Sequence, residues 1–352
     1  MNKETVFVGL SGGVDSSVAA LRLIKQGYNV VGVFIKVWHP DFMVCNWEQE
    51  RLDAMRVAAH LGIPFLTCDA EEAYRDGVAN YFIETYKKGL TPNPDVMCNQ
   101  VVKFGAFLDF AKAHGINLIA TGHYAQRINK EGTSQLYRGF DTNKDQSYFL
   151  WTLSNEQLTH ALFPVGNTEK DIIRKEAKSA RIPVATKKDS QGICFLGHVD
   201  IAEFLAHYVT LETGPVVNEH GKIVGEHKGA LIYTLGQRHG FTLSNTDATQ
   251  TPHYVIAKDT TTNTLTVGKE KPVLKQNNSI KLHNVVLRNV TAVGETVQAQ
   301  IRYRQTPFNV TCSLIDGDYA EFIPPQDTEL PASGQSCVLY KGDHCIGGGI
   351  IA

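Results

Sequence analysis

The stretch VFVGLSGGVDSSVAA, from Val6 to Ala20, decides how the rest of the chain is interpreted. It opens with a short apolar run typical of a buried strand, and Ser16–Leu23 has the apolar spacing of a helix. Between them, Gly12 and Gly13 permit a tight turn and a close approach of the backbone to a ligand. Three serines add hydroxyl donors where a helix N-terminus offers unpaired N–H groups: Ser11, Ser16 and Ser17. This combination predicts a phosphate-binding loop.

Two common phosphate-binding motifs do not match this loop. A P-loop requires GxxxxGK[ST], and no lysine follows Gly9 until Lys25, while the dinucleotide fingerprint GxGxxG fails on spacing. The segment instead resembles the PP-loop of ATP pyrophosphatases, SGGxDSS. That resemblance implies that the loop holds the pyrophosphate of ATP during an adenylation and that Asp15 helps to bind Mg²⁺. A glycine-rich turn without a ligand is the alternative.

Length and composition place the chain among globular proteins of more than one domain. At 352 residues it is too long for one ordinary core, and 43% hydrophobic with 20% charged residues is typical of a globular protein. No apolar run has the length of a membrane span, and the N-terminus lacks the pattern of a secretion signal. We therefore expect a cytoplasmic protein without a membrane partner.

Charge and cysteine content argue against several classes of protein and of metal site. The formal net charge of −2 lacks the basic excess common in nucleic-acid-binding proteins, so any RNA-binding surface must be a local patch. The seven cysteines are dispersed and contain no CxxC pair. This pattern argues against a disulfide framework and against a four-cysteine zinc site.

Strands and helices alternate through the first part of the chain. The expected strands are 6–8, 29–37, 63–68 and 116–121, and the expected helices are 16–23, 48–61, 70–88 and 103–114. This order predicts an α/β fold with a parallel sheet and helices on both faces. From Gly214 onward, short alternating runs broken by turns predict β structure. We expect a PP-loop domain over 1–200, a small mostly-β central domain over 201–270 and a C-terminal β-barrel over 271–352.

The segment TPNPDVMCN, residues 91–99, is the first candidate for chemistry. Its two prolines predict a stiff extended loop rather than a helix, with Asp95 and Cys98 in a fixed relation. Cys98 is a candidate nucleophile with an acid or base nearby. A buried, unreactive cysteine is the alternative.

The segment KKDSQGICF, residues 187–195, is the second candidate for chemistry. Lys187 and Lys188 precede a turn at Gly192, and a nearby ammonium lowers the pKa of a thiol and favours the thiolate of Cys194. The alternative is a buried cysteine in a strand.

Several segments together carry a resemblance over essentially the whole chain. They are GLSGGVDSS, TPNPDVMCN, ATGHY, DTNKDQSYFL, KKDSQGICF, YTLGQRHG, RYRQ and GGGII. In this order they resemble the bacterial tRNA-specific 2-thiouridylases, a family that installs sulfur at C2 of the wobble uridine, U34, in an ATP-dependent reaction. The resemblance implies a PP-loop catalytic domain, a small central domain and a C-terminal β-barrel.

The resemblance also implies a role for each of the two cysteines. Adenylation of the C2 oxygen makes AMP the leaving group and releases pyrophosphate. Cys194 would receive a persulfide from a sulfur-relay protein, and Cys98 would be the nucleophilic partner. Either the persulfide attacks the activated carbon and a disulfide between Cys98 and Cys194 releases the product, or Cys98 first frees hydrosulfide. Related enzymes with an iron-sulfur cluster use a third cysteine; here Asp95 stands at that position, which favours the persulfide route.

Further site residues are implied by the same resemblance. Asp95 matches an acid or base candidate. The implied ATP-binding residues are Gly9, Leu10, Ser11, Gly12, Gly13, Val14, Asp15, Ser16, Ile35 and Gly122. The implied tRNA-binding residues are Asn93, Pro94, Asp95, His123, Lys144, Asp145, Gln146, Arg302, Tyr303 and Gln335.

Some of these residues have structural alternatives. His123 follows a strand, where a histidine is as often structural as functional. Arg302 and Arg304 are expected on one face of a strand, where they could reach phosphates, although a solvated barrel strand would look the same.

The partners are a tRNA, by resemblance the Lys, Glu and Gln isoacceptors, and the sulfur-relay protein. One rival function is a PP-loop adenylating amidotransferase or synthetase acting on a small molecule, which has no use for two loop cysteines. A nucleotide-binding RNA chaperone without catalysis is a second rival.

Overall fold

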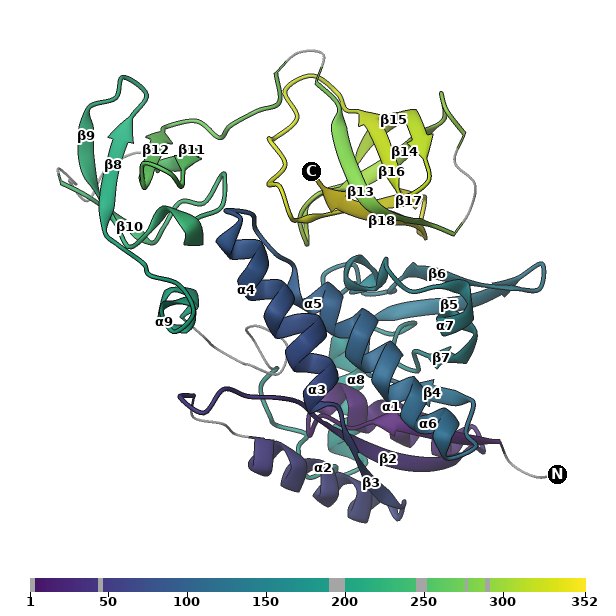
Figure 1. Cartoon of the computed structure of the whole chain (residues 1–352). Coiled ribbons are helices and arrows are strands. Elements are labelled where there is room, and N and C mark those ends of the chain that lie inside the picture. Colours follow the sequence, from purple (N-terminus) through teal and green to yellow (C-terminus); the bar gives the residue numbers. More distant parts are fainter. Residues whose placement is uncertain (1–3, 44–46, 190–199, 245–251, 276–277, 289–291) are drawn as a thin grey trace.

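The computed structural model describes residues 4–43, 47–189, 200–244, 252–275, 278–288 and 292–352. Figure 1 shows an α/β domain below, a small β domain at the upper left and a β-barrel at the upper right. The predicted α/β fold with a mostly-β central domain and a C-terminal barrel is confirmed. No helix in the described ranges is long and apolar enough to cross a membrane.

The N-terminal domain is built on a parallel sheet with strand order β3-β2-β1-β4-β7. Its strands are β1 (Thr5–Gly9), β2 (Asn29–Lys36), β3 (Phe65–Asp69), β4 (Leu118–Ala120) and β7 (Ala161–Leu162). The chain passes outward from β1 to β3 and then returns to place β4 on the other side of β1. The carboxyl ends of β1 and β4 therefore flank a switch point, where ligands bind in open α/β sheets.

Side chains of β1 alternate between two cores, so helices cover both faces of the sheet. Val6 and Val8 pack with α1 (Val14–Lys25), α2 (Trp47–Leu61) and α8 (Lys170–Ser179), whereas Phe7 packs on the opposite face. The predicted helices 16–23 and 48–61 correspond to α1 and α2.

Two long helices on the second face each contain a π-helical segment. The first consists of α3 (Glu71–Tyr74), η1 (Arg75–Ala79) and α4 (Asn80–Lys87), and the second of α5 (Pro94–Met97), η2 (Cys98–Ala106) and α6 (Phe107–Ala113). They approach closely at Gly77, where a Cβ would lie 2.6 Å from a methyl carbon of Val101. The first matches the predicted helix 70–88. The second begins nine residues before the predicted start at Lys103.

A β-hairpin that the sequence reading missed leaves this domain and joins the barrel. It consists of β5 (Ala125–Lys130) and β6 (Thr133–Arg138), with Glu131 and Gly132 in left-handed conformations at the turn. β6 pairs with strand β18 of the barrel, and η3 (Ser147–Leu150) and α7 (Asn155–His160) follow.

The central domain is an antiparallel and parallel mixed sheet with order β10-β9-β8-β12-β11. It follows the short helix α9 (Ile201–Ala206). Its elements are β8 (Gly214–Asn218), β9 (Ile223–His227), η4 (Ala230–Ile232), β10 (Phe241–Leu243), β11 (Tyr254–Asp259) and β12 (Thr264–Gly268).

In the C-terminal part, the strands β13-β16-β15-β14-β17-β18 close through pairing of β13 with β18. They are β13 (Ile280–Leu287), β14 (Thr296–Gln300), β15 (Phe308–Asp316), β16 (Tyr319–Ile323), β17 (Ser336–Lys341) and β18 (His344–Ile351). One face of β17 and β18 completes the core of the N-terminal domain, because Val338, Tyr340 and Cys345 pack in one cluster with Leu136 and Trp151. The barrel is therefore fused to the α/β domain by a shared core.

Candidate active site

The predicted phosphate loop lies between β1 and α1 and is held by its own polar groups. Ser17 Oγ donates to the Gly13 carbonyl (2.6 Å), and Ser16 Oγ accepts from the backbone N–H of Ser11 (3.3 Å). Gly13 is the N-cap of α1 and provides no side-chain cap. The serine hydroxyls thus hold the loop, and the first amides of α1 are left to receive an anion.

Two glycines allow other segments to lie against this loop. Gly12 has φ +68, and a Cβ there would lie 2.6 Å from the Glu50 carbonyl oxygen of α2. At Gly122, directly after β4, a Cβ would lie 2.6 Å from the backbone nitrogen of Ser16. The resemblance implies that Gly122 binds ATP. In the structure, its missing side chain makes room for the backbone of the loop.

The other implied ATP-binding residues lie at the same end of the sheet. Leu10 and Val14 are 1% and 4% exposed and pack in the core around α1, while Ile35 is 7% exposed near the end of β2. Gly9 ends β1, where a Cβ would lie 3.7 Å from a methyl carbon of Ile35. Because these side chains are buried, their backbone and the surface they form are what a nucleotide can contact.

Asp15 is held by two groups that sequence reasoning missed. Lys170 Nζ lies 2.7 Å from each carboxylate oxygen of Asp15, and the Tyr124 hydroxyl donates to one of them (2.8 Å). Burial, and after it the charge of Asp15, raise the pKa of Tyr124, so its hydroxyl remains a donor at neutral pH. Lys170 is separated from Asp15 by 155 positions, and no local pattern links them.

The lysine-rich segment before Cys194 ends in a cluster of charges beside Asp15. Asp189 accepts ion pairs from Lys170 (2.8 Å), Lys144 (3.1 Å) and Arg174 (2.5 Å). Burial alone would raise the pKa of Asp189, but hydrogen bonds from Lys170 and Lys144 outweigh it and lower the pKa to about 2. Cys194 itself lies outside the described residues.

Lys187 belongs to the same segment. It pairs with Asp53 of α2 at 2.9 Å. The residues at 187 and 189 are thus both anchored beside the phosphate loop, although the sequence suggested only a pKa effect of the lysines on Cys194.

The predicted extended loop at 91–99 is wrong, because α5 begins at Pro94. Asn93 is the N-cap and accepts from the backbone N–H of Val96 (3.4 Å), and proline is well tolerated at the first helical position, where its missing N–H is not needed. Asp95 is half-buried, and Cys98 is fully buried where η2 begins. A spacing of three residues on a helix brings these two side chains near one another.

The turn before this helix is a junction of all three domains. Gln335 Nε2 of the barrel donates to the carbonyls of Thr91 (3.3 Å) and Pro92 (2.9 Å), and the Thr91 N–H donates to the Ser333 carbonyl (2.9 Å). The Thr91 hydroxyl also lies 3.0 Å from that of Thr234 in the central domain. Gln335, expected to bind tRNA, therefore holds the backbone that leads to Cys98.

The implied tRNA-binding residues near Lys144 divide into exposed and buried ones. The Asp145 carboxylate pairs with Arg138 (2.9 Å) and accepts from the backbone N–H groups of Gly139 and Ser147, which makes it a structural anchor. The Gln146 side chain accepts from the backbone N–H of Tyr124 (2.9 Å). Lys144 keeps about a third of its side chain exposed beside Asp189.

His123 is buried and contacts Thr121 through Nδ1 at 2.8 Å. Burial, followed by the charge of Lys103, lowers the pKa of His123 well below 6.5, so the ring is neutral at pH 7. Its side chain contributes no positive charge to an RNA surface.

The predicted strand through Arg302 is also wrong. β14 ends at Gln300, and the chain turns through Arg304, which has φ +63. Arg302 pairs with Glu329 (3.0 Å) and donates to the Leu235 carbonyl of the central domain (3.0 Å), while the Tyr303 ring lies 4.5 Å from that of Phe149. Alternation along a strand therefore does not place Arg302 and Arg304 on one face.

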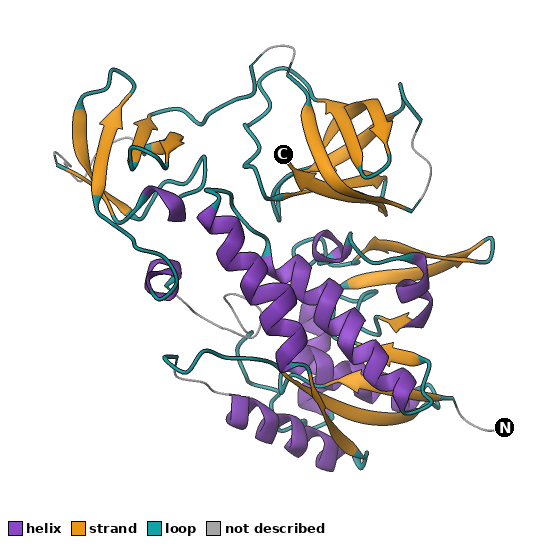
Figure 2. Cartoon of the chain, viewed as in Figure 1, coloured by secondary structure: helices purple, strands orange, loops and turns teal. Residues whose placement is uncertain are grey.

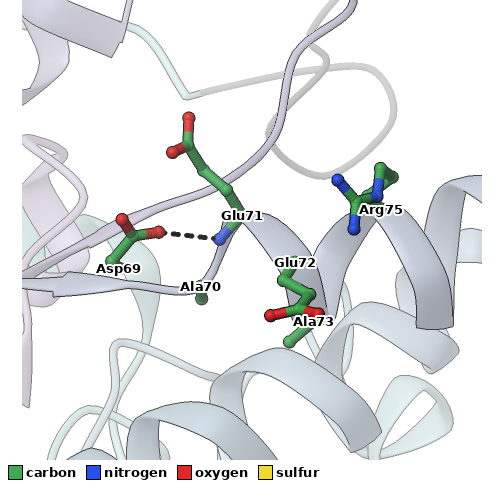
Figure 3. A pocket seen from close by; sticks show the side chains of 6 residues that line it. All are labelled: Asp69, Ala70, Glu71, Glu72, Ala73 and Arg75. Carbon is green, nitrogen blue, oxygen red and sulfur yellow. Dashed lines mark hydrogen bonds between the residues drawn. The ribbon is translucent and has the colours of Figure 1, made fainter.

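A separate hollow at the end of β3 contains none of the predicted site residues. Its lining includes the carboxylates of Asp69, Glu71 and Glu72, and Asp69 accepts from the backbone N–H of Glu71 (Figure 3). Among the described residues of the lining, three carboxylates against one cation, Arg75, leave the hollow net negative, which disfavours phosphates. Within the described chain, no group of three or more His, Cys, Asp or Glu side chains is placed to hold a metal.

A glycine- and serine-rich loop at the switch point of a parallel sheet, with an uncapped helix N-terminus, defines the class: an α/β nucleotide-binding domain of the PP-loop type. Family models match the description "tRNA methyl transferase HUP domain" over residues 4–198, "tRNA methyl transferase PRC-barrel domain" over 202–269 and "Aminomethyltransferase beta-barrel domain" over 278–351. The chain belongs to the family of tRNA-specific 2-thiouridylases named MnmA.

Three relatives with that name illustrate the similarity. The chain is 42% identical to the protein from Enterococcus faecalis, over 99% of this chain and 96% of the relative. It is 45% identical to the protein from Nitrosococcus oceani, over 100% of this chain and 97% of the relative. It is 44% identical to that from Escherichia coli, over 99% and 96%.

Proposed function

We propose that this chain is a tRNA-uridine 2-sulfurtransferase that thiolates the wobble uridine, U34, in an ATP-dependent reaction. Relatives named for this activity match it over nearly their full length. The observation that carries the proposal is the arrangement of Asp95 and Cys98 on a helix held at the junction of three domains, within the same domain as the phosphate loop.

ATP would bind across the carboxyl ends of β1 and β4. Its phosphates would meet the amides of α1, and its adenosine would lie near Ile35 and Gly122. Asp15 would help to hold Mg²⁺, an ion that prefers oxygen donors. The metal would neutralise phosphate charge during adenylation of the uridine C2 oxygen.

The chain's own residues would then perform the sulfur transfer. Adenylation turns an oxygen that cannot leave into AMP, which can. The terminal sulfur of a Cys194 persulfide, delivered by a relay protein, would attack C2 and displace AMP. The thiolate of the nucleophile Cys98 would then attack the Cys194 sulfur, releasing 2-thiouridine and leaving a Cys98–Cys194 disulfide that an external thiol reduces. Asp95, three positions before Cys98, is placed to hold or move a proton at the target base.

The tRNA has to present an unstacked base, because the Cys98 thiol is buried. Lys144 offers a partly exposed cation near the charge cluster at Asp189, and Asn93 and Pro94 border Asp95. We propose the Lys, Glu and Gln isoacceptors as substrates and the cytoplasm as the site of action, by analogy with the family. Asp145, Gln146 and Gln335 would support the RNA-binding segments from within rather than contact RNA through their side chains.

The test replaces Cys98 and Cys194 separately with serine in the full chain. Each variant is incubated with ATP, Mg²⁺, tRNA and a persulfide donor, and 2-thiouridine is measured by nucleoside mass spectrometry alongside AMP. Both variants should lose thiolation. Cys312→Ser, a buried barrel cysteine, is the matched control and should retain it. Thiolation that persists in both variants would favour the adenylating synthetase instead.

A further inference from the structure

Lys170 is a buried lysine whose ammonium lies between two carboxylates. Only 8% of its side chain is exposed, and Nζ lies 2.7 Å from both oxygens of Asp15 and 2.8 Å from Asp189. Lysine is almost never buried without such partners. Within the described part of the chain, Lys170 supplies the ion pair that Asp15 receives. A positive charge is therefore fixed beside the phosphate loop, although no lysine occurs in the loop motif itself.

Several groups fix the position of this ammonium. Lys170 is the first residue of α8, and its backbone N–H donates to the Asp141 carboxylate (3.1 Å). The Tyr124 ring lies 5.5 Å from Nζ. Asp189 is a second carboxylate partner of the ammonium and also pairs with Arg174 and Lys144. The ammonium is therefore fixed both by the loop motif, through Asp15, and by the segment that contains Asp189.

Asp15 lies in the first turn of α1, beside the helix N-terminus that has no side-chain cap. A polyphosphate bound there meets the negative charge of Asp15 unless a cation intervenes. When Mg²⁺ engages Asp15, the same ammonium is repelled by the metal and attracted by the phosphate oxygens. We infer that Lys170 is a phosphate-binding residue whose ammonium passes from Asp15 to the β- and γ-phosphates of ATP, the portion that leaves as pyrophosphate.

This inference rests on the proposed use of ATP. Measurements of ligand binding can test it independently of sulfur transfer. It assigns Lys170 to the pyrophosphate portion rather than to the adenosine. Lys170 would therefore supply, from a distant helix, the charge that a P-loop obtains from the lysine within its own motif. Loss of this charge should weaken every ligand that contains pyrophosphate and leave AMP unaffected.

The first experiment compares Lys170→Met with wild type by isothermal titration calorimetry on the full chain. The probes are Mg²⁺-pyrophosphate, Mg²⁺-α,β-methylene-ATP and AMP. We expect the first two to bind about thirtyfold more weakly, the loss of one charge-assisted contact, and AMP to change by less than about twofold. Lys175→Met, an exposed lysine on the same helix, removes the same charge and should change none of the affinities. Unchanged pyrophosphate affinity in Lys170→Met, or an equal loss for AMP, would overturn the inference.

A second variant decides the question if Lys170→Met does not fold. Asp15→Asn frees the ammonium from its carboxylate partner, so pyrophosphate without metal should bind at least about fivefold more tightly than to wild type. No gain in that measurement would show that Lys170 serves only to neutralise Asp15. Thiolation of tRNA by the wild type is measured separately, so failure of the proposed function and failure of this inference give different results.

Discussion

The phosphate loop and the helix that carries Cys98 are held in different ways. The loop is stabilised by contacts among neighbours, such as Ser17 Oγ to the Gly13 carbonyl. The helix depends on residues far along the chain, because the turn before it is held by Thr234 and Gln335. The difference teaches that the conformation of the phosphate loop can be predicted from one motif, whereas the position of the thiol is a property of the three-domain assembly.

The barrel has a structural role in this assembly beyond any contact with RNA. Arg138 of the hairpin pairs with Asp145, and its guanidinium lies 3.5 Å from the ring centre of Tyr340 in the barrel. The Tyr340 hydroxyl in turn lies 3.2 Å from that of Ser147. This buried polar group of residues connects the hairpin, the barrel and the segment after Lys144.

Replacing Arg138 with methionine should give the largest effect. It leaves the buried Asp145 carboxylate without its cation, which costs about 3 kcal/mol of unfolding free energy when a buried pair loses one partner. Urea unfolding followed by tryptophan fluorescence measures this. Lys112→Met removes an exposed pair with Glu156 and should cost under about 0.5 kcal/mol. Equal losses in the two variants would contradict a structural role for the Arg138 group.

Gly12→Ala tests the locally held region. The left-handed conformation (φ +68) costs about 1–2 kcal/mol for a residue with a Cβ, and here that Cβ would also meet the Glu50 carbonyl at 2.6 Å. ATP affinity should fall about a hundredfold, measured by calorimetry. Gly62→Ala is the matched control, since Gly62 has φ +66 and no atom within 4 Å of the added Cβ. Gly62→Ala should leave ATP affinity unchanged, and a Gly12→Ala variant that binds ATP as tightly as Gly62→Ala would contradict the predicted effect.

Sequence reasoning recovered the parallel sheet, the change to β structure after Gly214 and the phosphate loop, because each follows from short-range patterns. It failed at Pro94, where two prolines suggested an extended loop although proline suits a helix start. It also missed the hairpin at 125–138, whose alternation and Glu131-Gly132 turn were visible. Its pairing with β18 depends on a strand more than 200 positions away and was not readable locally.

The candidate site was recovered only in part for the same reason. The residues in motifs were identified, but their partners were not: Lys170 for Asp15, and Gln335 for the backbone at Thr91. The strand expected through Arg302 failed because β14 ends at Gln300 and a turn follows. Ion pairs and hydrogen bonds between distant segments produce no repeating pattern in the sequence, so they cannot be predicted from it in the way that helices and strands can.

Gln335→Ala separates a positioning role from an RNA contact. Without the Nε2 donor, the carbonyls of Thr91 and Pro92 lose a hydrogen bond worth about 1 kcal/mol, so the helix with Cys98 is held less firmly. We expect kcat for thiolation to fall about fivefold while KM for tRNA changes by less than about twofold. Gln326→Ala, at an exposed barrel loop, is the control. A rise in KM with kcat unchanged would instead assign Gln335 to direct tRNA binding.

Asp189→Asn should have the smallest effect, and it tests whether the phosphate-loop region is as local as its motif suggests. The pKa of Asp189 is lowered to about 2 from 3.8, so its ionised form contributes stability that is complete above about pH 4 and is lost as the pH falls toward about 2. Wild type should exceed the variant in unfolding free energy at pH 7, by under about 1 kcal/mol because the group is partly exposed, and the difference should close below about pH 4. Urea unfolding at several pH values measures this, with Asp171→Asn on α8 as an exposed control. A difference that does not depend on pH would mean that the charge of Asp189 does not hold Lys170, and that the phosphate loop depends on its own hydrogen bonds alone.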